Sequence, residues 1–196
     1  MNQTKLHKTL LRIVSIATMT AIVFLGNYLR IKIPVPLGGV TSFTLANIFC
    51  ALSGILLGPV GGFLAAGLGS AFYDLTDFAY VKEAPITLCT KGMYGLIAGL
   101  VLYLLLKSVK EKYGAQLAAT ACAAVSYMVV YCIKVYVYNG MIEQHFTEPV
   151  QCWALVVSKI PATITNGVIA MVVAPVLGVA LMKALKSAHL EKMLAQ

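Results

Sequence analysis

The chain has 196 residues, of which 60% are hydrophobic and only 11% are charged, whereas about 25% of the residues in a typical soluble domain are charged. This composition predicts an all-α integral membrane protein and excludes a soluble catalytic or ATP-binding domain within the chain. The net charge of +8 could indicate nucleic-acid binding, but the basic residues gather at alternate ends of the hydrophobic segments, which excludes nucleic acid and favours the lipid bilayer as partner.

The hydrophobic segments predict a bundle of six transmembrane helices in a single domain over residues 1–196, because about 20 residues are needed to cross the hydrocarbon. The expected spans cover about residues 10–29, 43–57, 63–75, 86–106, 116–138 and 152–184. Lys and Arg cluster before the first span, between the fourth and fifth spans, and after the sixth. Since basic residues favour the cytoplasmic side, both termini are expected to be cytoplasmic.

The first expected span carries two small residues, Ala17 and Ala21, one helical turn apart. Small residues at this spacing allow another helix to approach closely. Two interpretations stay open: ordinary close packing within the bundle, or a docking face for another protein.

The segment after the first span contains Pro34, Pro36, Gly38 and Gly39, which forbid a continuous helix. It is too apolar for a free loop, so we expect a gate-like outer loop folded over the bundle. A second glycine-rich stretch, residues 58–62, lacks the Lys and Ser/Thr of a phosphate-binding loop. We interpret it as a tight turn from the second span into the third.

The fifth expected span places a lysine and several tyrosines on one helical face. At about 100° per residue, Tyr127, Tyr131, Lys134 and Tyr138 fall within roughly 40° of one another. An ionisable side chain inside a membrane helix indicates a functional site, because it normally faces the bundle interior or a wet cavity. The alternative is that Lys134 reaches to the membrane surface and the tyrosines form an aromatic belt. Because an aromatic belt would surround one end of the helix, whereas these four side chains form a line about three turns long, we favour a cavity wall.

Polar side chains share faces in two other spans as well. Lys91 and Tyr94 lie together in the fourth span, and Lys159, Thr163 and Asn166 recur at helical spacing in the sixth. With the expected topology these side chains occupy the outer half of the bundle, while the inner half is almost without polar groups, which favours a pocket open to one side over a channel. The candidate substrate-binding residues are Asn47, Tyr73, Asp74, Lys91, Tyr94, Tyr131, Lys134, Tyr138, Lys159, Thr163 and Asn166.

The charges of this expected pocket favour an anionic or carbonyl-rich small molecule. Ammonium groups would bind its oxygens, and the tyrosines would stack on a ring. The alternative is that Lys91 or Lys159 pairs with Asp74 as internal structure, although the acidic residues are too few to pair every lysine.

The sequence shows no arrangement of a nucleophile with a base and no metal-binding motif, so we expect neither enzymatic activity nor a metal site. The five cysteines form no Cys-x-x-Cys pair, and they are interpreted as small packing residues without a disulfide framework.

Several motifs in order resemble a known family. They are Thr41-Ser-Phe-Thr-Leu-Ala-Asn47, Leu56-Leu-Gly-Pro-Val-Gly-Gly62, Ala66-Gly-Leu-Gly-Ser-Ala71, Lys91-Gly-Met-Tyr-Gly-Leu-Ile-Ala-Gly99 and Lys159-Ile-Pro-Ala-Thr-Ile-Thr-Asn166. Over about residues 10–185 the chain resembles the substrate-binding S component of energy-coupling factor (ECF) transporters, particularly the riboflavin-transporter-like branch.

The resemblance implies a multi-pass protein of the bacterial cell membrane that captures a vitamin or vitamin precursor from outside with high affinity. A transmembrane coupling subunit and two ATP-binding cassette ATPases would then drive it to topple in the membrane, so ATP is hydrolysed by partner subunits and this chain needs no cofactor. The face with Ala17 and Ala21 would dock on the transmembrane partner, although Leu25 replaces the third small residue expected. Residues 31–42 would close over the substrate.

The resemblance does not fix the substrate, because such proteins share shape more than side chains. Similar proteins serve riboflavin, pyridoxine, hydroxymethylpyrimidine, pantothenate and folate. Two rival functions also stay open. One is a small intramembrane enzyme acting on a lipid or quinone, with Lys134 or Tyr131 as the acid or base. The other is a stand-alone secondary transporter, for which the sequence shows neither inverted repeats nor paired acidic ion sites.

Overall fold

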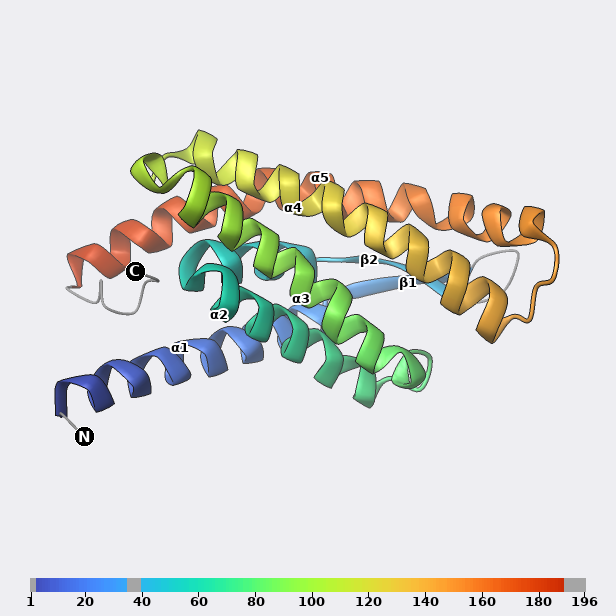
Figure 1. Ribbon diagram of the computed structural model, residues 1–196, viewed down its shortest axis with the longest axis horizontal. Coiled ribbons are helices and arrows are strands. Elements are labelled where there is room, and N and C mark those ends of the chain that lie inside the picture. The colour runs from blue at the N-terminus through green and yellow to red at the C-terminus, as the bar shows by residue number, and fades with distance from the viewer. Residues whose placement is uncertain (1–2, 35–39, 189–196) are drawn as a thin grey trace.

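Long helices make up most of the chain in the computed structural model, which describes residues 3–34 and 40–188 (Figure 1). Five of its helical segments are long and apolar enough to cross a membrane. The principal helices are α1 (Gln3–Tyr28), α2 (Ala46–Thr76), α3 (Ala84–Leu100), α4 (Tyr113–Lys134) and α5 (Pro149–Ser187). Short 3-10 turns, η1 (Val81–Glu83) and η3 (Lys107–Val109), precede and follow α3, and π-helices, η2 (Val101–Leu105) and η4 (Val135–Glu143), continue α3 and α4.

Helix α2 folds back on itself at Gly58. This glycine has a φ of 73°, in the region that side chains disfavour, and Pro59 follows it. Cys50 Sγ and Ser70 Oγ lie 3.9 Å apart, whereas residues that far apart in a straight helix would be separated by about 30 Å. The two halves therefore pack side by side. The expected count of six separate helices is not confirmed, because the spans expected at 43–57 and 63–75 belong to this one element.

Glycines let the two halves of α2 and helix α3 approach closely. A Cβ atom added to Gly62 would lie 2.6 Å from the Cα atom of Gly54 and 2.7 Å from the carbonyl oxygen of Gly95. Both distances are far inside van der Waals contact, so only glycine fits at Gly62. The α2–α3 contact is accordingly the most extensive between two elements of the described structure.

The segment expected to form an irregular gate is a pair of antiparallel strands. β1 (Arg30–Pro34) pairs with β2 (Val40–Thr44), with Arg30 opposite Thr44 and Pro34 opposite Val40. Helix α2 begins at Ala46, three residues after the approximate start expected for the second span, because the β-branched residues of β2 extend the chain up to Thr44. Of the expected gate residues, Pro34 ends β1, whereas Pro36, Gly38 and Gly39 lie outside the described residues.

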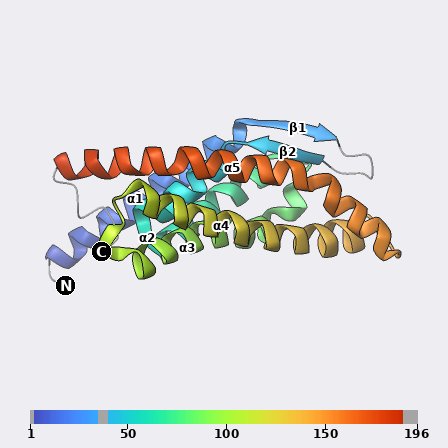
Figure 2. The ribbon, with the colours of Figure 1, turned by 90° about the horizontal axis from the view of Figure 1, so that it is seen from above.

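This strand hairpin lies along the outside of the bundle, next to α5 (Figure 2). On the β1 side, the Lys32 ammonium lies 2.5 Å from the Asp77 carboxylate, just beyond the end of α2. Burial alone would raise the pKa of Asp77, but the bonds from Lys32 and from the backbone N–H of Ala79 hold it below its ordinary value. The hairpin is thus tied to α2 by an ion pair.

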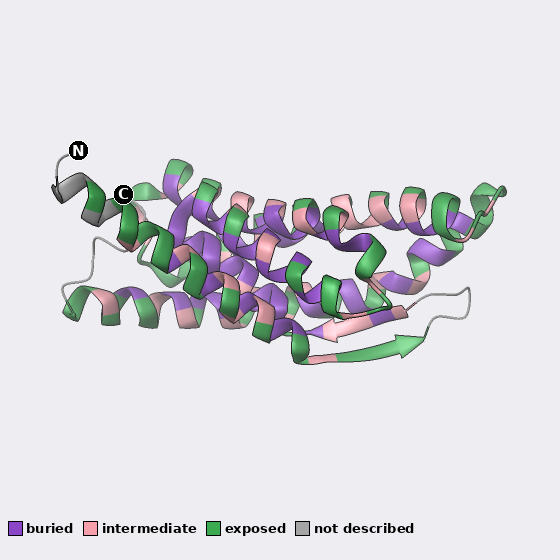
Figure 3. Ribbon diagram, turned by 90° about the horizontal axis from the view of Figure 1, so that it is seen from below, coloured by how far each residue is buried: buried purple, intermediate pink, exposed green. Residues whose placement is uncertain are grey.

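Buried residues concentrate where α2, α3, α4 and α5 meet, while the outer helix faces are exposed (Figure 3). Exposed apolar faces are expected of helices surrounded by lipid. Helix α1 begins and α5 ends at one end of the bundle, and the strand hairpin lies toward the other (Figure 1). The two ends of the molecule therefore differ: one carries the start of α1 and the end of α5, and the other carries the strand hairpin (Figure 1).

Candidate functional site

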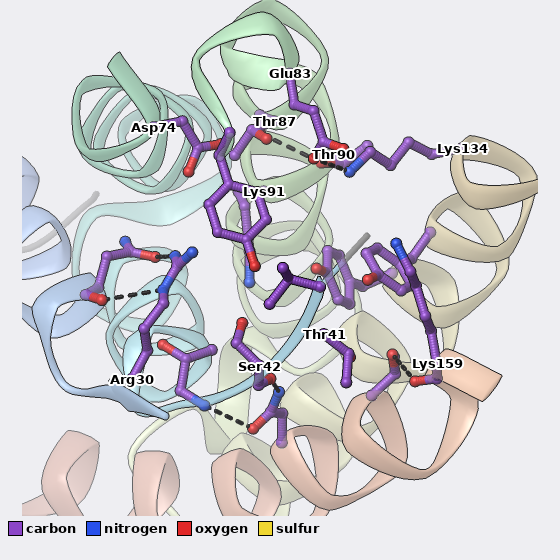
Figure 4. A pocket seen from close by; sticks show the side chains of 18 residues that line it. Arg30, Thr41, Ser42, Asp74, Glu83, Thr87, Thr90, Lys91, Lys134 and Lys159 are labelled. Atoms are coloured by element: carbon purple, nitrogen blue, oxygen red, sulfur yellow. Dashed lines mark hydrogen bonds and ion pairs between the residues drawn. The ribbon is translucent and has the colours of Figure 1, made fainter. Parts of the chain in front are cut away.

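A polar pocket lies where the strand hairpin meets the helices (Figure 4). Seven of the residues expected from the sequence line it: Asp74, Lys91, Tyr131, Lys134, Lys159, Thr163 and Asn166. It is also lined by residues absent from that set: Asn27, Arg30, Val40, Thr41, Ser42, Thr44, Tyr80, Glu83, Thr87, Thr90 and Tyr127. The hollow measures about 70 Å³. Its walls come from α1, both strands, α2, the α2–α3 connection, α3, α4 and α5.

The pocket is cationic. Four basic side chains and two carboxylates line it, which gives a formal charge of +2. Figure 4 shows these groups converging from different elements, with Arg30 from β1, Lys91 from α3, Lys134 from α4 and Lys159 from α5.

Lys134 is engaged in a buried ion pair with Glu83. Its ammonium donates to Glu83 Oε2, and the two side chains are only 9% and 8% exposed. The other oxygen, Oε1, accepts a 2.5 Å bond from Asn139 Nδ2. Lys134 therefore faces the bundle interior and does not reach for the membrane surface. The alternative pairing of Lys91 or Lys159 with Asp74 is not found among the described residues.

The ammonium group of Lys91 contacts neutral side chains outside the pocket wall or along it. It donates to Asn47 Oδ1 and stands 4.6 Å from the centre of the Tyr127 ring. Tyr94 packs edge-on against Tyr127, with ring centres 5.4 Å apart. Asn47 and Tyr94, both expected at the site, thus lie outside the pocket wall and support residues that form it.

Arg30 is a fourth cation of the pocket and was not among the residues expected from the sequence. Its Nε and NH2 groups donate to the main-chain and side-chain oxygens of Asn27, and its guanidinium lies 4.3 Å from the centre of the Tyr73 ring. Tyr73 therefore supports Arg30 from outside the pocket. Burial raises the pKa of the neighbouring Tyr80 phenol, an effect that Arg30 partly opposes. Arg30 reaches the pocket because β1 turns back over the bundle, which helical periodicity does not reveal.

Tyr138 does not line the pocket with the other members of its expected stripe. Its hydroxyl donates to the main-chain oxygen of Lys82 over 3.1 Å. The expected stripe assumes a regular α-helix with about 100° per residue, but the chain becomes a π-helix from Val135. A helix with i→i+5 bonds advances less per residue, so residues after Lys134 rotate off the expected face.

Asn166 binds the strand hairpin. Its Oδ1 accepts a 2.9 Å bond from the Thr44 main-chain N–H, and its Nδ2 donates over 2.8 Å to the Ser42 carbonyl oxygen. The side chain thus pairs with β2 as a neighbouring strand would. Its neighbour Thr163 donates to the Lys159 carbonyl oxygen within α5.

Replacing Asn166 with alanine should loosen β2 from α5, because both bonds are lost. A hydrogen bond contributes about 1 kcal/mol, so losing two should accelerate amide exchange in the peptide covering residues 40–44 by roughly 30-fold. Hydrogen–deuterium exchange with mass spectrometry measures this. Thr165→Ala, on the exposed side of the same helix, should leave the exchange unchanged. Equal rates in Asn166→Ala and the parent protein would show that the hairpin is held by other contacts.

The described residues contain no group of three His, Cys, Asp or Glu side chains that could hold a metal ion. What converges on the pocket is a set of cationic groups, with the hydroxyl of Thr41 beside them. Such donors bind the oxygen atoms of a small molecule. The lining of this pocket is therefore suited to a polar ligand.

Comparison with known proteins gives a family and a fold. A family model described as "ECF-type riboflavin transporter, S component" matches residues 7–183. A solved structure described as "Structure and mechanism of the S component of a bacterial ECF transporter" superposes with a TM-score of 0.62 at 20% identity, covering 89% of this chain and 97% of that one. At this identity the likeness shows the fold. No curated protein matches the chain.

Proposed function

Because the chain belongs to the family of ECF-type riboflavin transporter S components, we propose that it is the high-affinity substrate-capture subunit of an ATP-driven ECF vitamin importer. Membership makes it a multi-pass bacterial membrane protein that binds a transport substrate and associates with ECF module subunits. It is thus a transport protein and not an enzyme, so the intramembrane-enzyme alternative is set aside.

The cationic pocket under the strand hairpin is the observation that carries the proposal. Small-molecule sites usually measure about 300–1,000 Å³, whereas this hollow measures about 70 Å³. A vitamin therefore enters only if a wall moves. The hairpin is a wall that is not a transmembrane helix. It is linked to the described helices through Asn166, through the Lys32–Asp77 pair, and through Arg30, which binds Asn27 at the end of α1. We assign it as the cover that opens and closes over the substrate.

The pocket is proposed to face the outside of the cell, with both termini in the cytoplasm. The basic loop between α3 and α4 lies at the same end as the start of α1 and the end of α5, opposite the hairpin (Figure 1). Basic residues favour the cytoplasmic side. If each half of α2 is a separate crossing, the chain crosses the membrane six times and this orientation follows.

The coupling surface is proposed to lie on α1, away from the pocket. Ala17 and Ala21 are exposed and line an apolar groove of about 670 Å³ between α1 and the second half of α2, together with Phe24, Leu64 and Phe72. We assign this groove to the ECF transmembrane coupling subunit. Two ATP-binding cassette ATPases would hydrolyse ATP, so this chain would carry no cofactor.

Uptake by reconstituted vesicles tests the proposal. Purified protein is expected to bind one of riboflavin, pyridoxine, hydroxymethylpyrimidine, pantothenate or folate at submicromolar concentration, and native mass spectrometry of the freshly purified protein identifies which one to use. Vesicles with this chain alone should not accumulate that vitamin. Vesicles that also contain the coupling subunit and both ATPases should accumulate it when ATP is enclosed. Gradient-driven uptake by the chain alone would instead support a stand-alone transporter.

A further inference from the structure

We propose that the substrate is an anion with about two negative charges and that Lys159 and Lys91 bind its acidic oxygens. This inference rests on the proposed function and names the chemical class that the pocket selects. A phosphate monoester, or a molecule with two carboxylates, has this charge.

Lys159 is the first observation behind this assignment. Its side chain lines the pocket from α5, and the residue is only 5% exposed. Its ammonium has no hydrogen bond and no ion pair with any residue that the structure describes. Burying a charge without a partner is costly. In a binding site this free-energy cost is offset when the bound ligand supplies an oppositely charged group.

Lys91 repeats the pattern on α3. The residue is 8% exposed, and its ammonium is bound to the neutral amide of Asn47 and to the ring face of Tyr127. These contacts orient the charge without neutralising it. Two lysines on different helices thus present charge to one hollow without a carboxylate of their own.

The acids of the pocket cannot balance its cations. Glu83 is paired with Lys134, which leaves Asp74 to face the charges of Arg30, Lys91 and Lys159. The pocket therefore keeps its formal charge of +2. An anion with two charges neutralises it, whereas a neutral ligand leaves both lysines uncompensated.

The tyrosines of the pocket are largely engaged with the protein. Tyr127 and Tyr131 stack on each other with ring centres 5.7 Å apart, and Lys91 covers the Tyr127 face. The ring stacking expected from the sequence therefore contributes less to recognition than charge does. Thr87 and Thr90 line the same hollow, but the Thr90 hydroxyl already donates to the Thr87 carbonyl oxygen over 3.3 Å. The ammonium groups therefore supply the donors for an acidic group.

Thermal unfolding of the purified protein in detergent tests this with inorganic phosphate as the probe. Phosphate is titrated against chloride at constant ionic strength, and we expect the melting temperature to rise by roughly 5–10 °C at a hundred times the dissociation constant. Lys159→Gln should abolish the rise. Because this variant loses an uncompensated buried charge, it should fold and be at least as stable as the parent in chloride. Lys82→Gln removes the same charge from an exposed position and should keep the response.

Matched vitamin pairs extend the test to organic ligands. Riboflavin 5′-phosphate is compared with riboflavin, and folate, which has two carboxylates, with its neutral diamide. For a pair that binds, we expect the acidic member to bind at least about tenfold more tightly than the neutral member, a difference of about 1.4 kcal/mol. Lys159→Gln should remove this preference. Equal binding of both members, a preference that survives Lys159→Gln, or equal effects of phosphate and chloride would overturn the inference. ATP-driven uptake of a neutral vitamin would overturn it while leaving the proposed function intact.

Discussion

Replacing Lys134 with methionine is expected to destabilise the protein by about 3–5 kcal/mol, the usual cost of removing one partner of a buried ion pair. Methionine keeps the length and apolar character of the stem, so the lost interaction is the ammonium group. Glu83 would remain 8% exposed at its side chain, with a charge that Asn139 alone would solvate. Chemical unfolding in detergent, followed by circular dichroism, measures the change.

Two further variants separate this effect from a general loss of charge. Lys134→Met combined with Glu83→Gln should regain most of the stability, because a buried pair is often replaced by neutral groups at little cost. Lys32→Met breaks the Lys32–Asp77 pair, whose lysine side chain is 41% exposed, and should cost less than about 1 kcal/mol. If Lys134→Met is as stable as the parent, or the double variant is no better than the single one, the ion pair does not stabilise the fold.

The sequence predicts pocket residues where one regular helix carries them. Lys159, Thr163 and Asn166 repeat at helical spacing, and in the structure all three are buried and line the pocket from α5. Lys91 and Tyr131 likewise line it from α3 and α4. Helical periodicity determines which side chains share a face. When the helix geometry is constant, this is sufficient to predict which of them line a pocket. Tyr138 departs from its expected face because η4 changes that geometry.

The partners of these residues could not be predicted in the same way. Glu83 lies 51 residues from Lys134 in sequence, in the short turn before α3, and helical periodicity does not connect a turn to a distant helix. The contribution of Arg30 depends on the antiparallel pairing of β1 with β2. Long-range pairings of this kind follow from tertiary packing, so the sequence indicated a cationic pocket but not which lysine was already neutralised.

Replacing Ala17 with tryptophan is expected to lower ATP-driven uptake by roughly tenfold or more, the effect of losing about 1.4 kcal/mol of docking energy, while substrate binding by the isolated chain stays unchanged. An indole at this position would fill the groove between α1 and α2 that Ala17 and Ala21 line. Asn27, the residue of α1 that lines the pocket, is about 15 Å further along the helix. Binding is measured by calorimetry on the purified chain, and uptake in vesicles with the coupling subunit and ATPases.

The control variant introduces a tryptophan on an exposed apolar face of another helix. Val172 lies on α5 and is 54% exposed, so Val172→Trp should insert into lipid and leave both binding and uptake unchanged. Leu25, one turn beyond Ala21, is 61% exposed and stands where a third small residue was expected on the proposed coupling helix. Leu25→Ala should therefore preserve or increase uptake, because a smaller side chain lets a partner helix approach more closely. Normal uptake by Ala17→Trp would move the coupling surface away from this groove, because a bulky ring there could not be accommodated in a close helix contact.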